Sequence, residues 1–177
     1  MMLVKGLVRL NALLLVAGGL ALVLMALHVS LDAFGKYALS MPIPATLEIV
    51  AYYYMPAVVA LPLAFVEMRN GHVTVDLLFE MFPPPVQKLV LLLNGLVTAG
   101  FLGTLCWLAG REALRKFLIN EFMFGEYPII IWPGRVVFTL GFAFLTLVVV
   151  VKLASLLFGV RDPFVSQLPP VDKEDAA

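Results

Sequence analysis

Charge is scarce in this chain, and cysteine and histidine are nearly absent. Charged residues make up 14% of the 177-residue sequence, against about 25% in an ordinary soluble domain. Hydrophobic residues make up 62%, and the mean hydropathy is +1.01. A soluble domain of this size could not bury so much apolar surface. The sequence therefore predicts a membrane protein that buries its apolar surface in the lipid bilayer.

Several classes of function are disfavoured by what the sequence lacks. The 12 basic and 12 acidic residues balance, so no basic surface for nucleic acid is expected. A single cysteine, Cys106, rules out an intrachain disulfide. The sequence contains no nucleophile–base pair, no glycine-rich phosphate loop and no cysteine cluster. We therefore predict that the chain is not an enzyme.

Long apolar runs dominate the rest of the sequence. Each has at least the roughly 20 residues that a helix needs to cross the hydrocarbon core. Only helices satisfy their own backbone groups there, which predicts an all-α membrane protein with four transmembrane helices. We expect one domain over residues 1–160, and a polar, proline-rich cytoplasmic tail, disordered, over 161–177. The four runs are Leu10–Ala33, Thr46–Val66, Val86–Leu108 and Trp132–Phe158.

Two of these helices carry further signals. Pro56 and Pro62 interrupt the second run, and each removes a backbone donor. We expect this helix to be bent and packed against protein. Glu112 and Lys116 form an i,i+4 pair after the third run, so that helix is expected to continue to about Leu118.

The most polar internal stretch follows the second run. His72, Asp76 and Glu80 would share one face of a short helix, His72–Phe82, with apolar residues on the other face. Such a helix is too short to span and is expected to lie in the membrane interface. Because Gly71 permits a sharp turn into it, the sequence predicts an interfacial amphipathic helix between the second and third spans.

These polar groups suggest docking rather than chemistry. A solvated or partner-facing stripe explains the spacing of His72, Asp76 and Glu80 better than a metal site does, so we expect no metal. His28 and His72 belong to opposite ends of the bundle and could not ligate one haem together, so we expect no cofactor. Arg69 could pair with Glu67 or with a carboxylate of another protein. We therefore predict a partner interface formed by Glu48, Glu67, Arg69, Gly71, His72 and Asp76.

A second polar set lies at the far end of the first helix. His28, Asp32 and Lys36 are spaced by four residues and would share one face there. Glu48 opens the second helix after a short loop. Electrostatic pairing between helix ends and a partner contact or ion path are both open interpretations of this face.

The basic residues give a weak signal of orientation. Lys5 and Arg9 precede the first span, and basic residues are enriched in cytoplasmic segments. With an even number of spans, both termini are then expected in the cytoplasm. The cluster formed by Arg111, Arg115 and Lys116 would lie outside and opposes this orientation.

Two stretches resemble a known family. They are SLDAFGKYALSMPIPATLEIVAYY and PLAFVEMRNGHVTVDLLFEMFP. Together they are similar to the small, Q-type membrane subunit of tripartite ATP-independent periplasmic (TRAP) transporters. The resemblance covers about residues 10–158. It depends on the acidic Glu48, which opens the second helix, and on the run from Arg69 through Gly71 and His72 to Asp76. Lys36 departs from the family pattern, in which arginine is expected.

The resemblance implies a role in a bacterial inner membrane. Such a subunit supports a large membrane subunit in sodium-coupled uptake of an organic acid delivered by a periplasmic substrate-binding protein. The expected function is therefore that of a small permease or scaffold subunit. The alternative is a membrane anchor for a redox or other enzyme complex.

Overall fold

The computed structural model describes residues 2–69, 81–123, 128–160 and 162–164. It contains four helices that are long and apolar enough to span a membrane, as the apolar runs predict, so the all-α membrane fold is confirmed. The expected interfacial helix, His72–Phe82, falls mainly outside these ranges and stays a prediction. The elements are α1 (Met2–Ala38), α2 (Thr46–Ile49), η1 (Val50–Tyr54), α3 (Met55–Ala60), α4 (Leu63–Met68), α6 (Pro84–Leu118), β1 (Phe122–Met123), β2 (Ile129–Ile130) and α7 (Trp132–Leu157).

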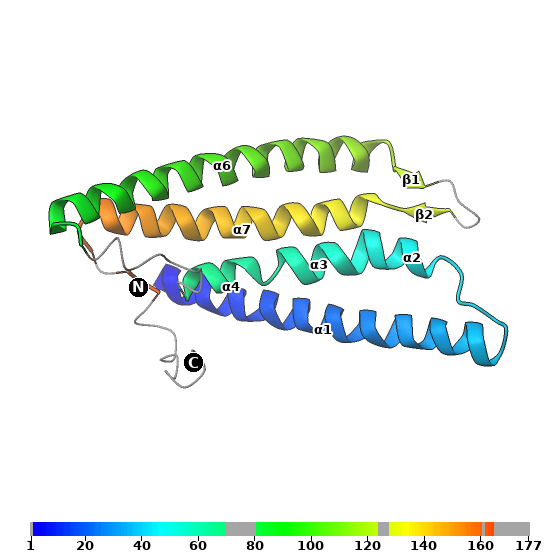
Figure 1. Cartoon of the computed structure of the whole chain (residues 1–177). Helices are drawn as coiled ribbons and strands as arrows, with labels where there is room; N and C mark the ends of the chain where they lie inside the picture. Colours follow the sequence, from blue (N-terminus) through cyan, green and yellow to red (C-terminus); the bar gives the residue numbers. More distant parts are fainter. Residues whose placement is uncertain (1, 70–80, 124–127, 161, 165–177) are drawn as a thin grey trace, which may run out of the picture.

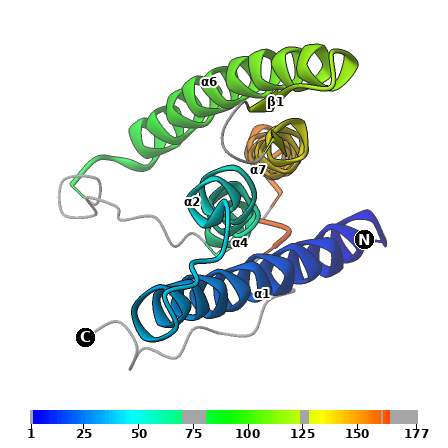
Figure 2. The same ribbon diagram turned by 90° about the vertical axis from the view of Figure 1, so that its right-hand side faces the viewer.

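The helices lie in a row (Figures 1 and 2). α1 packs chiefly on the second span, the second span packs on α7, and α7 packs on α6. In the most apolar window of each helix, 6% of the residues are buried in α1 and α6, against 28% in α7. The two outer helices therefore present most of their apolar side chains to the surroundings.

The second span, Thr46–Met68, is irregular where the prolines predict it. A π-helical turn, η1, precedes Pro56, and the helix is interrupted at Leu61–Pro62 before α4 begins. Proline has no N–H to donate to the carbonyl four residues earlier, so Pro56 frees the carbonyl of Tyr52. Neighbouring helices cover such carbonyls in membrane proteins. The helix is therefore irregular at both prolines and packs against protein on two sides, α1 and α7.

Two glycines of α7 make that packing close. A Cβ atom built on Gly134 would lie 1.7 Å from the backbone oxygen of Tyr52. One built on Gly141 would lie 2.5 Å from the backbone oxygen of Ala60. Small residues let two helix backbones approach in this way. α7 and the second span therefore form the central pair of the row.

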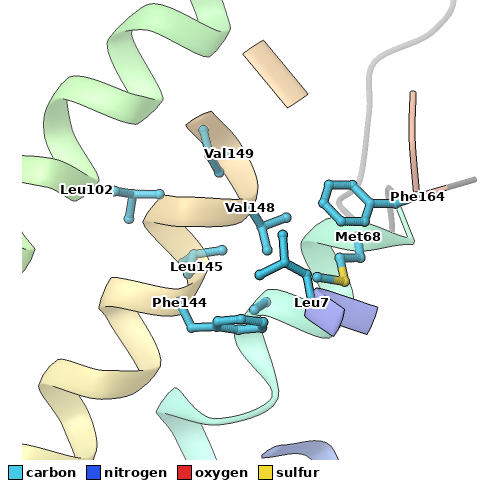
Figure 3. Packing of buried hydrophobic residues seen from close by; sticks show 9 residues of the cluster. Leu7, Met68, Leu102, Phe144, Leu145, Val148, Val149 and Phe164 are labelled. Carbon is cyan, nitrogen blue, oxygen red and sulfur yellow. The ribbon is translucent and has the colours of Figure 1, made fainter. Parts of the chain in front are cut away.

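The main buried cluster lies at the end of the molecule where α1 begins and α4 ends (Figure 3). Met68, Val148 and Phe164 are fully buried in it. Phe164 comes after α7, which ends in a Schellman motif: Gly159 has φ +67°, and Val160 N–H donates to Ser155 O at 2.9 Å. The ordered packing thus continues to Phe164, whereas the expected tail began at residue 161. Residues 165–177 are outside the described ranges, so the disordered tail stays a prediction.

At the other end of the helices, away from the main buried cluster, a short antiparallel pairing of β1 with β2 connects α6 to α7. Phe122 pairs with Ile130, and Met123 pairs with Ile129. Asn120, with φ 47°, turns the chain after α6. α6 itself ends at Leu118, so the predicted extension of the third helix is confirmed. At about 1.5 Å per residue, its 35 residues are longer than the hydrocarbon core is thick.

Candidate functional site

The predicted partner interface begins at the end of α4, where Glu67 is held inside the chain. Lys152 Nζ of α7 lies 3.0 Å from Glu67 Oε1 and also donates to the Glu67 backbone oxygen. Asp162 Oδ2 lies 3.9 Å from the same ammonium. The Lys152 and Glu67 side chains are 14% and 18% exposed. This ion pair therefore joins α4, α7 and the segment that carries Phe164.

Arg69 lies beside this ion pair in the sequence but does not join it. Its guanidinium carbon lies 4.7 Å from the centroid of the Phe65 ring, within range of a cation–π contact. Its Nε atom is buried and has no acceptor among the described residues. Glu67, one of the two partners expected for Arg69, pairs with Lys152, and the other expected partner, a carboxylate of another protein, stays a prediction. A buried N–H without an acceptor is costly, so this atom has an unused capacity to bind.

Of the other predicted interface residues, only Glu48 lies in the part of the chain that the structure describes. Gly71, His72 and Asp76 lie outside the described residues. Glu48 is half-buried in the first turn of α2, at the opposite end of the second span. Nineteen residues separate it from Glu67, about 28 Å of helix. Glu48 would therefore serve a contact other than the one at the end of α4.

The second polar set fixes the turn between the first two spans. Asp32 Oδ1 accepts a hydrogen bond from Ile43 N–H at 2.7 Å. His28 Nε2 lies 3.5 Å from Thr46 Oγ1, and its ring meets Tyr54 edge-on at 5.9 Å between centroids. Lys36 is exposed, with its ammonium 5.7 Å from the Tyr37 ring centroid. Asp32 and His28 thus contact the turn and the start of the second span, and Lys36 projects outward.

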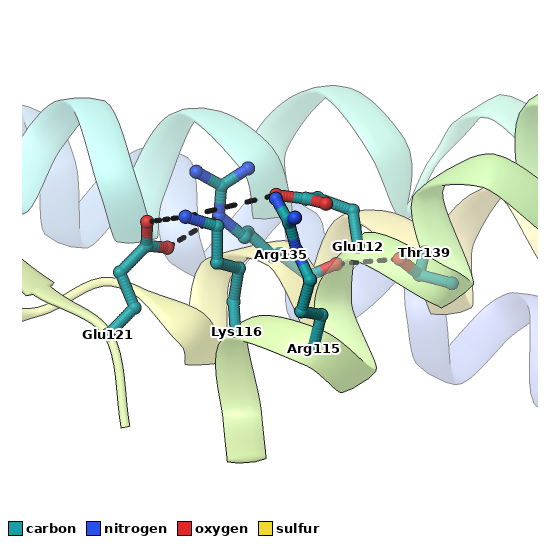
Figure 4. A network of polar contacts seen from close by, with 6 residues as sticks. All are labelled: Glu112, Arg115, Lys116, Glu121, Arg135 and Thr139. Carbon is teal, nitrogen blue, oxygen red and sulfur yellow. Dashed lines mark hydrogen bonds and ion pairs between the residues drawn. The ribbon is translucent and has the colours of Figure 1, made fainter. Parts of the chain in front are cut away.

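A larger polar network lies at the end of α6 and the start of α7, next to the β-pairing (Figure 4). In the sequence, the basic cluster served as a signal of orientation and was assigned no role in a site. Glu121 receives a hydrogen bond from Lys116 and another, 3.0 Å long, from Arg135 Nε. Glu112 lies 3.0 Å from Arg115. The hydrogen bond from Lys116 is the main cause that lowers the pKa of Glu121, and the positive charge of Arg135 adds to it against partial burial. We call these five residues the α6–α7 charge network.

One polar residue in the spans was missed by sequence reasoning. Asn94 is exposed on α6, between Leu93 and Leu96, which are 55% and 63% exposed. No described residue hydrogen-bonds its amide. The signal available in the sequence was an asparagine well inside the third apolar run. A lipid tail cannot satisfy an amide, so Asn94 is a candidate contact with another protein.

Metal or catalytic chemistry finds no support in the described ranges. Among those residues, no three His, Cys, Asp or Glu side chains come together as metal ligands would. The His72, Asp76 and Glu80 stripe lies outside them, so the expectation of no metal there stays a prediction.

These features define a class and then a family. Long apolar helices that are able to span a membrane, with charged residues near their ends, define a small multi-pass membrane protein. The profile of the DctQ component of tripartite ATP-independent periplasmic transporters matches residues 25–159. This range holds three complete spans and the end of α1, and the chain belongs to that family. It is therefore a transporter component of the inner membrane, not an enzyme. Comparison with curated proteins and with solved structures gave no match.

Proposed function

We propose that the chain is a scaffold subunit of a TRAP transporter. It binds the large membrane subunit during sodium-coupled uptake of an organic acid, which a periplasmic binding protein delivers. Family membership supports a role in a three-part transporter. The substrate pathway belongs to the large subunit, because the described spans of this chain carry few polar groups that could line one.

Asn94 is the observation that carries the proposal of a bound membrane partner. It lies ten residues into α6, about 15 Å from the start of the helix, and its exposed neighbours are apolar. In lipid alone its amide would be left unsatisfied. A helix of the large subunit packed against this face of α6 would supply a hydrogen-bond partner.

The end of α4 provides a second contact in the proposal. Arg69 has a buried Nε without an acceptor among the described residues, and it opens the run that contains Gly71, His72 and Asp76. We assign Phe65–Phe82 as a docking element, with Arg69 bound to a carboxylate or carbonyl of the large subunit. Because Glu67 already pairs with Lys152, its role is to hold the end of α4 in place.

The proposal is tested by co-purification of the large subunit and by uptake in the assembled transporter. Replacing Asn94 with leucine removes an interhelical hydrogen bond worth about 0.6–2 kcal/mol in membranes, so association should weaken about 3- to 25-fold. Thr104→Val is the matched control on the same helix, because the Thr104 hydroxyl donates to Gly100 O at 2.8 Å and needs no partner.

Two further measurements complete the test. Arg69→Ala and Asp76→Ala, made singly, should also lower the yield of complex and the uptake. The chain reconstituted alone in liposomes should give no sodium-driven uptake of organic acids. Wild-type yield and uptake in the Asn94 and Arg69 variants, or substrate-specific uptake by the chain alone, would refute the scaffold function.

A further inference from the structure

A cavity of about 280 Å³ lies beside the α6–α7 charge network. Three elements enclose it: the second span, the last turns of α6 and the first turns of α7. Its walls are mixed in chemistry, with aromatic and aliphatic groups beside one arginine and one glutamate. The lining residues are Tyr52, Pro56, Ala109, Glu112, Ile131, Gly134, Arg135, Phe138 and Thr139.

The cavity wall contains two charged groups of opposite sign, and each has atoms that could still bind a ligand. Arg135 uses its Nε for Glu121, and no described residue accepts a bond from its two terminal nitrogens. Glu112 contacts Arg115 at 3.0 Å and Lys116 at 3.9 Å through its Oε1 atom. The Arg135 guanidinium and the Glu112 carboxylate belong to residues that line the same cavity, and Figure 4 shows both within the charge network. A ligand with a negative and a positive group would match this pair.

The depth of the cavity points to a lipid. Trp132 follows the lining residue Ile131 in the sequence and meets Phe117 edge-on, with 4.8 Å between the ring centroids. Tryptophan is enriched at the level of the lipid headgroups. The volume is below the range of roughly 300–1,000 Å³ that encloses a drug-sized molecule. The small volume and the nearby tryptophan both suit a ligand of which only one end enters the cavity. The rest of such a ligand would extend along the helices into the bilayer.

We propose that this cavity binds the headgroup of an aminophospholipid. The phosphate lies on the terminal nitrogens of Arg135, because a guanidinium binds phosphate oxygens in pairs. The ammonium group lies on the Glu112 carboxylate. The first part of an acyl chain covers Pro56, Ala109 and Phe138. A soluble dicarboxylate fits less well, because Glu112 would repel its second charge.

The site would join three elements through one molecule. Lipid bound between the second span, α6 and α7 would stabilise the folded state by mass action, since the unfolded chain has no such cavity. The same chemistry is available in either leaflet, so the inference does not depend on the orientation of the chain.

Native mass spectrometry of the full-length chain tests the proposal. The protein is extracted from nanodiscs that contain equal amounts of phosphatidylethanolamine and phosphatidylglycerol, and the retained lipid is identified. The wild type should retain phosphatidylethanolamine in several-fold excess. Ala109→Leu, which fills the cavity and leaves its charges in place, should lose the retained lipid.

Charge variants separate the roles of the two groups. Glu112→Gln should keep a bound phospholipid but lose the preference for phosphatidylethanolamine, and Arg135→Gln should lower retention of both lipids. Arg111→Gln is the control, because Arg111 is an exposed arginine of the same helix that does not line the cavity. Equal retention of the two lipids by the wild type, or unchanged retention in Ala109→Leu, would overturn the proposal. Displacement of the lipid by inorganic phosphate or succinate would instead assign a site for soluble anions and would also overturn it.

Discussion

Single charged residues in this chain connect elements that are distant in the sequence. Lys152 is the clearest case, because its ammonium contacts Glu67, 85 residues away, and approaches Asp162. A lysine near the end of a membrane helix could otherwise extend to water. Here the ammonium is largely covered, so its partners hold the end of α4 and the segment before Phe164 against α7.

Glu121 provides a prediction on pH at the same scale. Its pKa lies below the ordinary value of 4.5, chiefly because Lys116 donates a hydrogen bond to it. Its contribution to stability is therefore complete above the unfolded-state pKa and is lost as the pH falls through the lower, folded-state pKa. Glu121→Gln should lower the unfolding free energy at pH 7 by about 1 kcal/mol, given the modest value of partly exposed ion pairs.

The difference between wild type and Glu121→Gln should shrink as the pH falls below the unfolded-state pKa of the carboxyl and disappear below its folded-state pKa, which is the lower of the two. Reversible unfolding by detergent, followed by circular dichroism, measures it. Glu112→Gln is the control, since the Glu112 side chain is 37% exposed and should show a smaller difference at pH 7. A difference between Glu121→Gln and wild type that persists or grows at acid pH would contradict the assigned ion pairs.

The sequence predicted where polar residues would gather but not which atoms they would contact. His28 and Asp32 were expected to pair electrostatically or to bind a partner, whereas Asp32 accepts from the Ile43 backbone. That contact depends on the path of the loop, which spacing on a helix does not determine. Asn94 was missed because hydropathy averages over a window and one amide changes the average little.

At the scale of elements, the irregular second span was the most predictable feature. Pro56 and Pro62 each remove a backbone donor, so a bend follows from local chemistry alone. The close approach of Gly134 and Gly141 to this span was not predictable in the same way. The contact depends on which helix lies next to which, and all four runs are apolar enough to be neighbours.

Gly141→Ala is predicted to weaken the central helix pair. The new Cβ would lie 2.5 Å from the Ala60 backbone oxygen, so α7 and the second span must move apart, at a cost of about 1–3 kcal/mol. Gly103→Ala on α6 is the control, because nothing lies within 4 Å of its Cβ position. The control should be neutral or stabilising by up to about 1 kcal/mol, since alanine favours a helix. Equal unfolding free energies for the two variants would refute the close contact.

At the scale of the whole molecule, the structure places the start of α1 and the end of α7 at one end (Figure 1). Both ends of the spanning region therefore lie on one side of the membrane. The basic cluster that opposes cytoplasmic termini has part of its positive charge neutralised, since Glu112 and Glu121 pair with Arg115, Lys116 and Arg135. Hydropathy predicted the number of spans, but not the order in which they pack, because that order depends on contacts between runs of similar composition.

The cytoplasmic position of both termini is predicted from Lys5 and Arg9. Reporters that are active only in the cytoplasm or only in the periplasm, fused after Ala177 and within residues 40–45, measure it. The fusion after Ala177 should be active in the cytoplasm, and the fusion in the 40–45 turn in the periplasm. The reverse pattern would mean that Arg111, Arg115 and Lys116 set the orientation despite their acidic partners.

The row of helices also affects the membrane around the chain. A row has a longer perimeter than a square cluster of the same helices, so more boundary lipid must order itself against α1 and α6. Any protein that covers one of these flanks shortens that perimeter and returns ordered lipid to the bulk bilayer. Assembly would then be driven partly by the entropy of released lipid, and its strength should vary with acyl-chain composition even where no residue at the contact is changed.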